Sequence, residues 1–336
     1  MILLTGGAGY IGLHTAAVLI EAGHEVVLFD NFSNSKPLAV QRLEAIVGRP
    51  VPCVRGDVRS RRDMDGLFDQ YPIGAVIHFA GLKAVGESVA QALRYYDNNV
   101  AGTLVLLEAM QRAEVRRFVF SSSACVYGDP DASPIPESAA LRPANVYGRT
   151  KLMVEEILRD LHVAAPAWSI ALLRYFNPVG AHASGLIGED PNGIPNNLMP
   201  FVTQVAVGRL PELRVFGGDY PTPDGSGVRD YIHVMDLAEG HRAALDWTLR
   251  DSREVLTANL GTGQGYSVLD LVRAFEQASG RPIPHRIVAR RAGDVPAYWG
   301  DPTLARQCLG WTARRTLEDM CRDSWNWQSR NPQGFA

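Results

Sequence analysis

The fold of this chain is decided by the stretch Thr5-Gly6-Gly7-Ala8-Gly9-Tyr10-Ile11-Gly12, which stands directly after an apolar run at residues 2–4. Helical periodicity begins at about residue 11 and continues to about residue 22. Small residues in a turn between a strand and a helix let the backbone approach a pyrophosphate, and the free amides of the first helical turn point at its negative charge. The stretch therefore predicts a dinucleotide site, with a purely structural tight turn as the alternative.

Outward from this turn, the first half of the chain alternates short apolar runs with helical stretches, as in a doubly wound parallel sheet. We expect strands at residues 2–4, 25–29, 51–55, 75–79, 117–121 and 169–174. We expect helices at residues 11–22, 38–47, 61–70, 86–110 and 146–162. The predicted fold is α/β, with a Rossmann-like NAD domain over residues 1–178 and a smaller mixed α/β lobe for the substrate over residues 179–336, where Gly, Pro and Asn become dense. This boundary is approximate, and segments can interleave across it.

Composition excludes several classes of protein. The 336 residues carry a formal net charge of −3, which gives no electrostatic reason to expect nucleic acid or an anionic membrane as partner. No apolar run approaches the roughly 20 residues that span a bilayer. The first residues run directly into the expected strand, so we expect no signal peptide. The four cysteines are scattered and the histidines form no metal-binding pattern, so we expect reduced thiols, no protein-bound metal and a cytoplasmic location.

The chemistry is indicated by Tyr147 and Lys151, which lie four residues apart and therefore on one face of the expected helix. Lowering the pKa of a tyrosine from about 10 to about 7 takes roughly 4 kcal/mol. An ammonium at about 6 Å supplies roughly 2.8 kcal/mol at an effective dielectric of about 20. A positively charged oxidised nicotinamide nearby would supply the rest. Ser123, after the expected fifth strand, would hydrogen-bond the substrate oxygen that Tyr147 deprotonates.

Further candidates for the cofactor recur at the ends of successive expected strands. Asp30 ends the second strand, where it would accept from the adenosine ribose and repel a 2′-phosphate, which favours NAD over NADP. Asp57 and Val58 follow the third strand, where the adenine amino group would be met. Small residues follow the fourth strand, at Ala80 and Gly81, and would admit the cofactor backbone. Taken singly, the sites after the third and fourth strands are more typical of ordinary loops than of ligand contacts, but their ordered recurrence favours the cofactor.

These residues, with the later run Arg229-Asp230-Tyr231-Ile232-His233-Val234, resemble the extended short-chain dehydrogenase/reductase family. Four longer runs closely resemble its UDP-glucose 4-epimerase branch, and they stand at residues 78–88, 175–181, 193–200 and 293–299. The resemblance covers essentially the whole chain, and runs of this length are highly specific.

The resemblance implies a set of binding residues. NAD would contact Gly6, Gly9, Tyr10, Ile11, Gly12, Asp30, Asn31, Asp57, Val58, Phe79, Ala80, Gly81, Lys83, Asn98, Ser121, Tyr147, Lys151 and Phe176. The UDP-sugar would contact Ser123, Tyr147, Asn177, Asn197, Leu198, Arg229, Arg291, Asp294 and Tyr298. Within this second set, the arginines suit a diphosphate because their planar forks bind oxygens in pairs.

The same resemblance implies the reaction. UDP-glucose and UDP-galactose would be interconverted at C4 through a 4-keto sugar, with NAD held tightly and regenerated in each cycle. The bulky ring of Tyr298 would crowd a 2-acetamido group, so we expect a preference for sugars that are not N-acetylated. The family likeness also implies a homodimer built from the helices at residues 86–110 and 146–162.

Two alternatives are weighed against this reading. A nucleotide-sugar 4,6-dehydratase on the same fold would need an acid and a base beside C5 and C6. The family's dehydratases carry an Asp-Glu pair where this chain has Ser123-Ala124. A catalytically silent NAD-binding protein should have lost Tyr147, Lys151 or Ser123, and all three are present.

Overall fold

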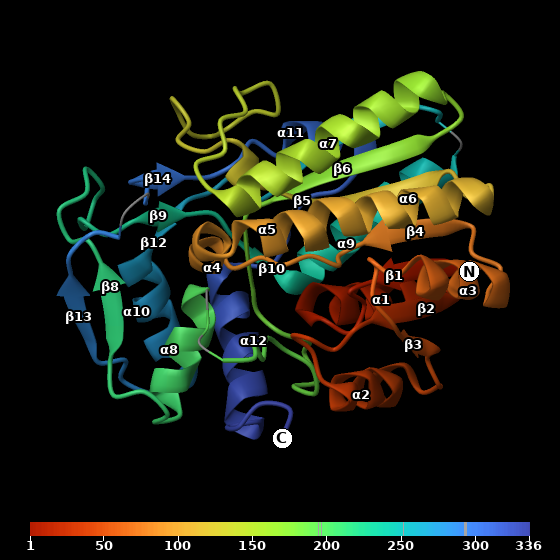
Figure 1. Ribbon diagram of the computed structural model, residues 1–336. Helices are drawn as coiled ribbons and strands as arrows, with labels where there is room; N and C mark the ends of the chain where they lie inside the picture. The colour runs from red at the N-terminus through yellow and green to blue at the C-terminus, as the bar shows by residue number, and fades with distance from the viewer. Residues whose placement is uncertain (194, 196, 251, 292–293) are drawn as a thin grey trace.

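A parallel sheet of seven strands, in the order β11-β6-β5-β4-β1-β2-β3, organises the molecule (Figure 1). The computed structural model describes residues 1–193, 195, 197–250, 252–291 and 294–336. Ile194, Asn196 and Gly293, which belong to the runs that resemble the epimerases, lie outside the described residues. The strands of the sheet are β1 (Ile2–Thr5), β2 (Val26–Asp30), β3 (Cys53–Arg55), β4 (Ala75–His78), β5 (Arg117–Ser123), β6 (Ser169–Tyr175) and β11 (Val255–Leu260). The predicted doubly wound α/β fold is confirmed.

Helices cover both faces of the sheet, because neighbouring strand residues point to opposite sides and both sides are apolar. Leu4 packs into one core and Leu3 into the other. The first core is covered by α1 (Tyr10–Glu21), α2 (Pro37–Val47), α9 (Val234–Leu249) and α11 (Thr303–Leu309). The second is covered by α3 (Arg61–Gln70), α6 (Gly102–Arg112) and α7 (Val146–Ala164). No helix of the described residues is both long and apolar enough to cross a membrane.

The single helix expected over residues 86–110 is wrong. The chain forms α4 (Val85–Ala90), α5 (Ala92–Tyr95), a π-helical segment η1 (Tyr96–Ala101) and then α6. Gln91 separates α4 from α5, with φ −128° and ψ 48°. Neither glycine nor proline stands at this break, so no local pattern in the sequence indicates it. The wider π-helical turn presents Asn99, which is buried, toward the loop that follows β4.

The seventh strand was not among those expected, since it comes from the second half of the chain. β11 pairs in parallel with β6, from Val255 opposite Ile170 to Leu260 opposite Tyr175. α9, from the same half, packs against β5 and β6. The second half therefore contributes the strand β11 and the covering helices α9 and α11 to the seven-stranded sheet and its first core, while a boundary after residue 178 stays a prediction.

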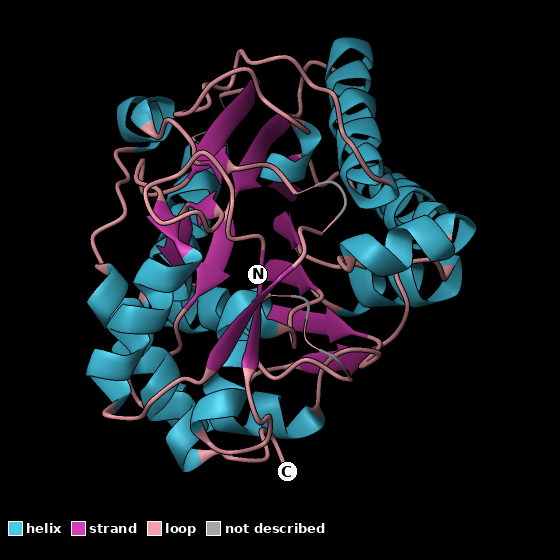
Figure 2. Cartoon of the chain, turned by 90° about the vertical axis from the view of Figure 1, so that its left-hand side faces the viewer, coloured by secondary structure: helices cyan, strands magenta, loops and turns pink. Residues whose placement is uncertain are grey.

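The rest of the second half forms a lobe of small sheets and short helices, on the side that faces the viewer in Figure 2. Its sheets have the strand orders β12-β9-β14, β10-β7 and β13-β8. Their strands are β7 (Asn177–Val179), β8 (Leu213–Phe216), β9 (Val228–Arg229), β10 (Tyr231–His233), β12 (Tyr266–Ser267), β13 (His285–Val288) and β14 (Ala297–Tyr298). Its helices are α8 (Leu198–Ala206), α10 (Val268–Ser279) and α12 (Leu317–Arg330). The lobe meets the carboxyl end of β5, because the Tyr298 hydroxyl donates to the Ala124 carbonyl, in the short helix η2 (Ala124–Val126).

Candidate active site

The glycine turn between β1 and α1 is too tight for side chains. Gly6 has φ +66°, and a Cβ there would lie 2.7 Å from the Ala80 amide nitrogen. A Cβ on Gly12 would lie 2.6 Å from the Gly6 carbonyl oxygen. No side chain caps α1, whose N-cap is Gly9, so the first amides of the helix are left for a ligand. This cradle fits the pyrophosphate of NAD, and it places the predicted Tyr10, Ile11 and Ala80 around it.

The two acids predicted to meet the adenosine lie at the ends of adjacent strands. Asp30 is 8% exposed and accepts from the amides of Ala8, at 3.1 Å, and Phe32, at 2.8 Å. Burial raises the pKa of Asp30 above its ordinary value, against these hydrogen bonds. Asp57 accepts from Asn31 at 3.4 Å, and the hydrogen bonds of Arg59 lower the pKa of Asp57 to about 2. Two carboxylates therefore stand beside the adenosine end of the predicted site, together with the buried Val58.

The loop after β4 approaches α7 at Lys151. A Cβ on Gly81 would lie 3.6 Å from Lys151 Nζ and 3.5 Å from Asn99 Oδ1. Asn99 accepts from the Leu82 amide at 2.8 Å and donates to the Leu82 carbonyl at 2.9 Å, so its side chain fixes this loop. The predicted Asn98 donates to Asn99 at 3.0 Å. Asn99 was missed from the sequence, because its role depends on the π-helical turn.

Tyr147, Lys151 and Ser123 converge at the end of β5. Asn145 caps α7 by accepting from the Gly148 amide at 2.8 Å, so Tyr147 stands in the first helical turn. Lys151 follows one turn later, with Nζ 6.0 Å from the centre of the Tyr147 ring. Ser123 ends β5, where its hydroxyl lies close enough to the Tyr147 phenol to lower the pKa of that phenol. The structure thus brings together the three residues that the sequence analysis named as catalytic.

Burial shifts the pKa values of both Tyr147 and Lys151 away from those of the free side chains. Burial raises the pKa of Tyr147 above its usual range, and Cys125 and Tyr175 raise it further, whereas Ser123 opposes them. Burial lowers the pKa of Lys151 to about 8. The Lys151 ammonium donates to the Ser121 carbonyl at 2.6 Å. Because burial raises the pKa of Tyr147, we still expect the oxidised nicotinamide to supply a second positive charge beside that of Lys151.

Arg229 and Tyr298, predicted for the UDP-sugar, and Phe176, predicted for NAD, lie in the part of the second lobe that meets the end of β5. Tyr298 of β14 stands opposite Arg229 of β9 in the strand register. The Tyr298 hydroxyl donates to Ala124, next to Ser123 in the chain. The rings of Phe176 and Tyr298 have centroids 5.4 Å apart. These contacts place an aromatic wall and an arginine beside the catalytic set.

The remaining predicted substrate residues are spread along the lobe. Asn177 belongs to β7 and donates its amide to the Asp230 carbonyl at 3.0 Å. Leu198 is the first residue of α8. Arg291 and Asp294 form an ion pair with each other at 3.0 Å, so the two predicted contacts to the nucleotide are mutual partners in this structure.

Glu189 was missed from the sequence, although it joins the two halves of the predicted site. Its Oε1 accepts from Lys83 at 3.3 Å and from the side chain of Asn197 at 2.8 Å. Lys83 was predicted for NAD and Asn197 for the UDP-sugar. Only the acidic pair Glu189-Asp190, in a stretch otherwise rich in Gly, Pro and Asn, could have indicated this role.

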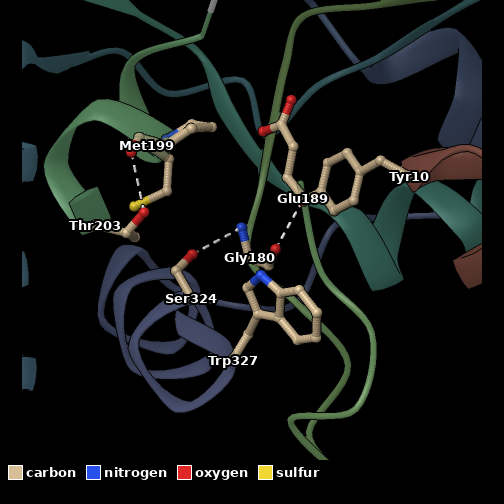
Figure 3. Close-up of a pocket in the computed structure, with 8 residues that line it drawn as sticks. Tyr10, Gly180, Glu189, Met199, Thr203, Ser324 and Trp327 are labelled. Atoms are coloured by element: carbon tan, nitrogen blue, oxygen red, sulfur yellow. Dashed lines mark hydrogen bonds between the residues drawn. The ribbon is translucent and has the colours of Figure 1, made fainter. Parts of the chain in front are cut away.

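A small cavity marks the junction between the glycine turn and the second lobe (Figure 3). Its volume is about 10 Å³, and it is lined by Tyr10, Gly180, Glu189, Met199, Pro200, Thr203, Ser324 and Trp327. The Tyr10 hydroxyl donates to the Gly180 carbonyl at 2.7 Å, and the Gly180 amide donates to Ser324 at 3.1 Å. This space suits one water molecule and no sugar, so the junction is closed by direct contacts.

The geometry can be compared with known proteins. A family model described as GDP-mannose 4,6 dehydratase matches residues 3–324. A UDP-glucose 4-epimerase of Bacillus subtilis (strain 168) is 58% identical over 334 residues, covering 99% of this chain and 98% of the relative. The crystal structure of UDP-glucose 4-epimerase from Bifidobacterium longum in complex with NAD+ and UDP has a TM-score of 0.96 at 54% identity, covering 99% of both chains. That of UDP-glucose 4-epimerase from Stenotrophomonas maltophila, with bound NAD and formylated UDP-arabinopyranose, has a TM-score of 0.96 at 53% identity, covering 99% of this chain and 98% of that one.

Proposed function

The chain belongs to the extended short-chain dehydrogenase/reductase family, within its UDP-glucose 4-epimerase group, and from this premise we propose that it interconverts UDP-glucose and UDP-galactose at C4 of the sugar. The reaction passes through a 4-keto sugar and serves galactose metabolism. The observation that carries this function is the convergence of Tyr147, Lys151 and Ser123 at the carboxyl end of β5, beside the glycine turn.

The cofactor is NAD, and the residues of the first half fit it. The glycine turn would hold the pyrophosphate, Asp30 the adenosine ribose, and Asp57 the adenine amino group. Bound there, the cofactor would supply a reversible acceptor for the hydride of C4, and it would be regenerated in every cycle. Lys151 would bridge the nicotinamide ribose, since its ammonium lies under Gly81 at the inner end of this site.

The chain's own residues move the proton. Tyr147 would take the proton from the 4-hydroxyl of the sugar, and Ser123 would hydrogen-bond the same oxygen. The Lys151 ammonium stabilises the phenolate electrostatically. When the keto sugar is reduced, Tyr147 returns the proton to the oxygen, which completes the cycle without a solvent-derived reagent.

Epimerisation requires the keto sugar to present its other face while the nucleotide stays bound. Arg229, Asn177 and Arg291 would hold the diphosphate, and Asp294 would accept from the uridine ribose. The ion pair between Arg291 and Asp294 would keep these two side chains beside each other. Asn197 and Leu198 would border the nucleotide at the start of α8. Anchoring at the nucleotide leaves the sugar ring free to turn.

One feature of the site supports epimerisation over dehydration, and a second supports a preference for sugars without an acetamido group. The end of β5 carries Ser123 and Ala124, where the dehydratases of this family carry an Asp-Glu pair that could assist elimination. Tyr298 is 9% exposed and packs beside Ala124, so its ring would crowd a 2-acetamido group. UDP-glucose and UDP-galactose are therefore the preferred substrates.

We also propose that the enzyme is a homodimer. Apolar side chains are exposed on the broken helical segment and on α7, at Val89 (67% exposed), Leu93 (85%), Leu104 (42%) and Met153 (39%). Leu107, on the same segment, is buried in the core, so the apolar residues divide between the core and a free surface. Light scattering after gel filtration tests this, and a monomer at micromolar concentration would contradict it.

A cytoplasmic location is the companion proposal. It rests on the four cysteines, Cys53, Cys125, Cys308 and Cys321, which are all free thiols. A fluorescent fusion expressed in the source cells would test it, and export of the fusion would contradict it.

The reaction is tested by incubating purified protein with UDP-galactose, without added cofactor, and following the sugar nucleotides by NMR. Convergence on one UDP-glucose and UDP-galactose mixture from either starting side, without net NADH, is the expected result. A dehydrated sugar would indicate the 4,6-dehydratase, and no conversion after addition of NAD would contradict the proposal.

A further inference from the structure

One face of α7 is fastened to the end of β5 at three levels. Tyr147 lies beside Ser123, which lowers its pKa, and one turn later Lys151 donates to the Ser121 carbonyl at 2.6 Å. After another turn, Glu155 accepts from the Ser122 hydroxyl at 2.6 Å. Eight residues of helix span about 12 Å, so three consecutive residues of β5 hold a long stretch of α7.

Glu155 is an unusual member of this set because it is an acid with no exposed surface. Arg174 of β6 neutralises it, with Nε donating to Oε1 at 2.9 Å and Nη2 donating to Oε2 at 2.5 Å. Burial alone would raise the pKa of Glu155, but the hydrogen bonds and charge of Arg174 outweigh it and leave the pKa below its ordinary value. Glu155 is therefore held as a carboxylate inside the protein.

The network continues across the sheet. Arg174 donates to the Tyr127 hydroxyl at 3.1 Å, and Tyr127 donates to Asn259 of β11 at 2.7 Å. All three side chains are buried. One hydrogen-bonded chain thus runs from α7 through β5 and β6 to the edge strand of the sheet.

Such a network is not explained by stability. Replacing a buried ion pair with apolar side chains of similar size is often neutral or stabilising. Apolar packing is non-directional, however, and does not by itself fix the height of a helix along a strand. Directional contacts do, and catalysis depends on placing reacting groups to a fraction of an ångström. Ser122 lies on the same side of β5 as Phe118 and Phe120, which is the side that α7 covers.

We propose that Glu155 is a positioning residue, which with Ser122 and Arg174 fixes α7 against β5 so that Tyr147 and Ser123 address the same sugar oxygen. This role rests on the proposed epimerase function. Glu155 itself would touch neither sugar nor cofactor, because it lies two turns beyond Tyr147 behind the end of β5.

Ser122→Ala tests the proposal most selectively, since it removes the link to β5 and leaves the pair of Glu155 and Arg174 intact. The expected result is a fall in kcat of about tenfold with KM for UDP-galactose, NAD content and Tm nearly unchanged. In a Tyr147→Phe background, the same substitution should change kcat by less than twofold, because the residue through which it acts is gone. Arg159→Met is the matched control: Arg159 donates to Glu155 from the exposed side at 3.2 Å, and its loss should leave kcat within twofold.

If Ser122→Ala does not fold, the double variant Glu155→Met/Arg174→Met replaces the pair by apolar side chains. It should fold and retain NAD but lose at least tenfold in kcat. Wild-type kcat in either folded variant would overturn the positioning role, as would an equal loss from Ser122→Ala in both backgrounds. Wild-type turnover is measured first: its absence overturns the proposed function itself, whereas wild-type turnover with an unaffected variant overturns only the role of Glu155.

Discussion

Lys151 lies one helical turn after Tyr147, with its ammonium nitrogen 6.0 Å from the centre of the Tyr147 ring and 2.6 Å from the Ser121 carbonyl oxygen. The position of the charge is thus fixed by the backbone of β5. Burial nevertheless raises the pKa of Tyr147, so the charge of one lysine does not by itself produce a phenolate. We therefore expect Tyr147 to act as a base only when the cofactor is bound.

Replacing Tyr147 by Phe removes the group that accepts the sugar proton. We expect kcat to fall by about 10³-fold, the range found for a positioned general base, with fold and NAD content retained. Initial rates with UDP-galactose measure the effect. Tyr220→Phe is the control, since the Tyr220 hydroxyl is buried without a hydrogen-bond partner among the described residues. Near-normal turnover of Tyr147→Phe would show that Tyr147 is not the catalytic base.

Adding a methyl group to the glycine turn should loosen NAD. The new Cβ of Gly12→Ala would lie 2.6 Å from the Gly6 carbonyl oxygen and 2.8 Å from the Gly7 Cα, so the backbone of the turn must open. We expect the purified variant to carry less than a tenth of the wild-type NAD, measured after denaturation. Gly66→Ala, in α3, meets nothing within 4 Å and should retain full NAD. Full retention by Gly12→Ala would contradict the assigned pyrophosphate cradle.

Reducing the side chain of Tyr298 should widen the range of sugars. Tyr298→Ser is expected to raise kcat/KM for UDP-N-acetylglucosamine at least tenfold relative to UDP-glucose, because the aromatic wall beside Ala124 is lost. Tyr298→Phe keeps the ring and loses only the hydroxyl, so it should still discriminate against the acetamido group. Equal discrimination by the Ser variant, or loss of it in the Phe variant, would contradict a steric origin.

Buried histidines should make the protein sensitive to acid. Burial lowers the pKa of His241 to about 4 and those of His14 and His78 to about 3. Below pH about 6.5 these histidines bind protons in the unfolded chain but not in the folded chain. Their contribution to the free energy of unfolding is therefore fully present above that pH and is lost as the pH falls toward 4. Each group contributes about 1.4 kcal/mol per pH unit within this window.

His241→Phe isolates one of these groups, since the ring already stacks near Phe79 at 4.8 Å and Tyr175 at 5.6 Å. Between pH 6.5 and 5, urea unfolding of this variant should lose about 2 kcal/mol less stability than the wild type. An unchanged slope in His241→Phe would show that His241 does not resist protonation in the folded state.

Features fixed by local backbone geometry could be predicted from the sequence. The glycine turn, the acid at the end of β2, and the spacing of Tyr147 and Lys151 on one helical face all appear where the pattern placed them. Each depends on a few neighbouring residues, so the sequence pattern was sufficient.

Features fixed by distant contacts could not be predicted. The helix break at Gln91 contains no glycine or proline that would indicate it. β11 is recognisable as a strand of the main sheet only through its pairing with β6. Glu155 and Glu189 read as ordinary acids until folding buries one against Arg174 and sets the other between Lys83 and Asn197. The raised pKa of Tyr147 likewise arises from burial, which no local pattern encodes.

The most direct test of the account follows one isotope. Purified protein is incubated in ordinary water with UDP-galactose deuterated at C4, without added cofactor, and the UDP-glucose formed is analysed by NMR and mass spectrometry. If hydride passes from C4 to bound NAD and back, the deuterium should be retained at C4, because it returns to the carbon it left. Loss of the deuterium to solvent, or a product that has lost water, would contradict it.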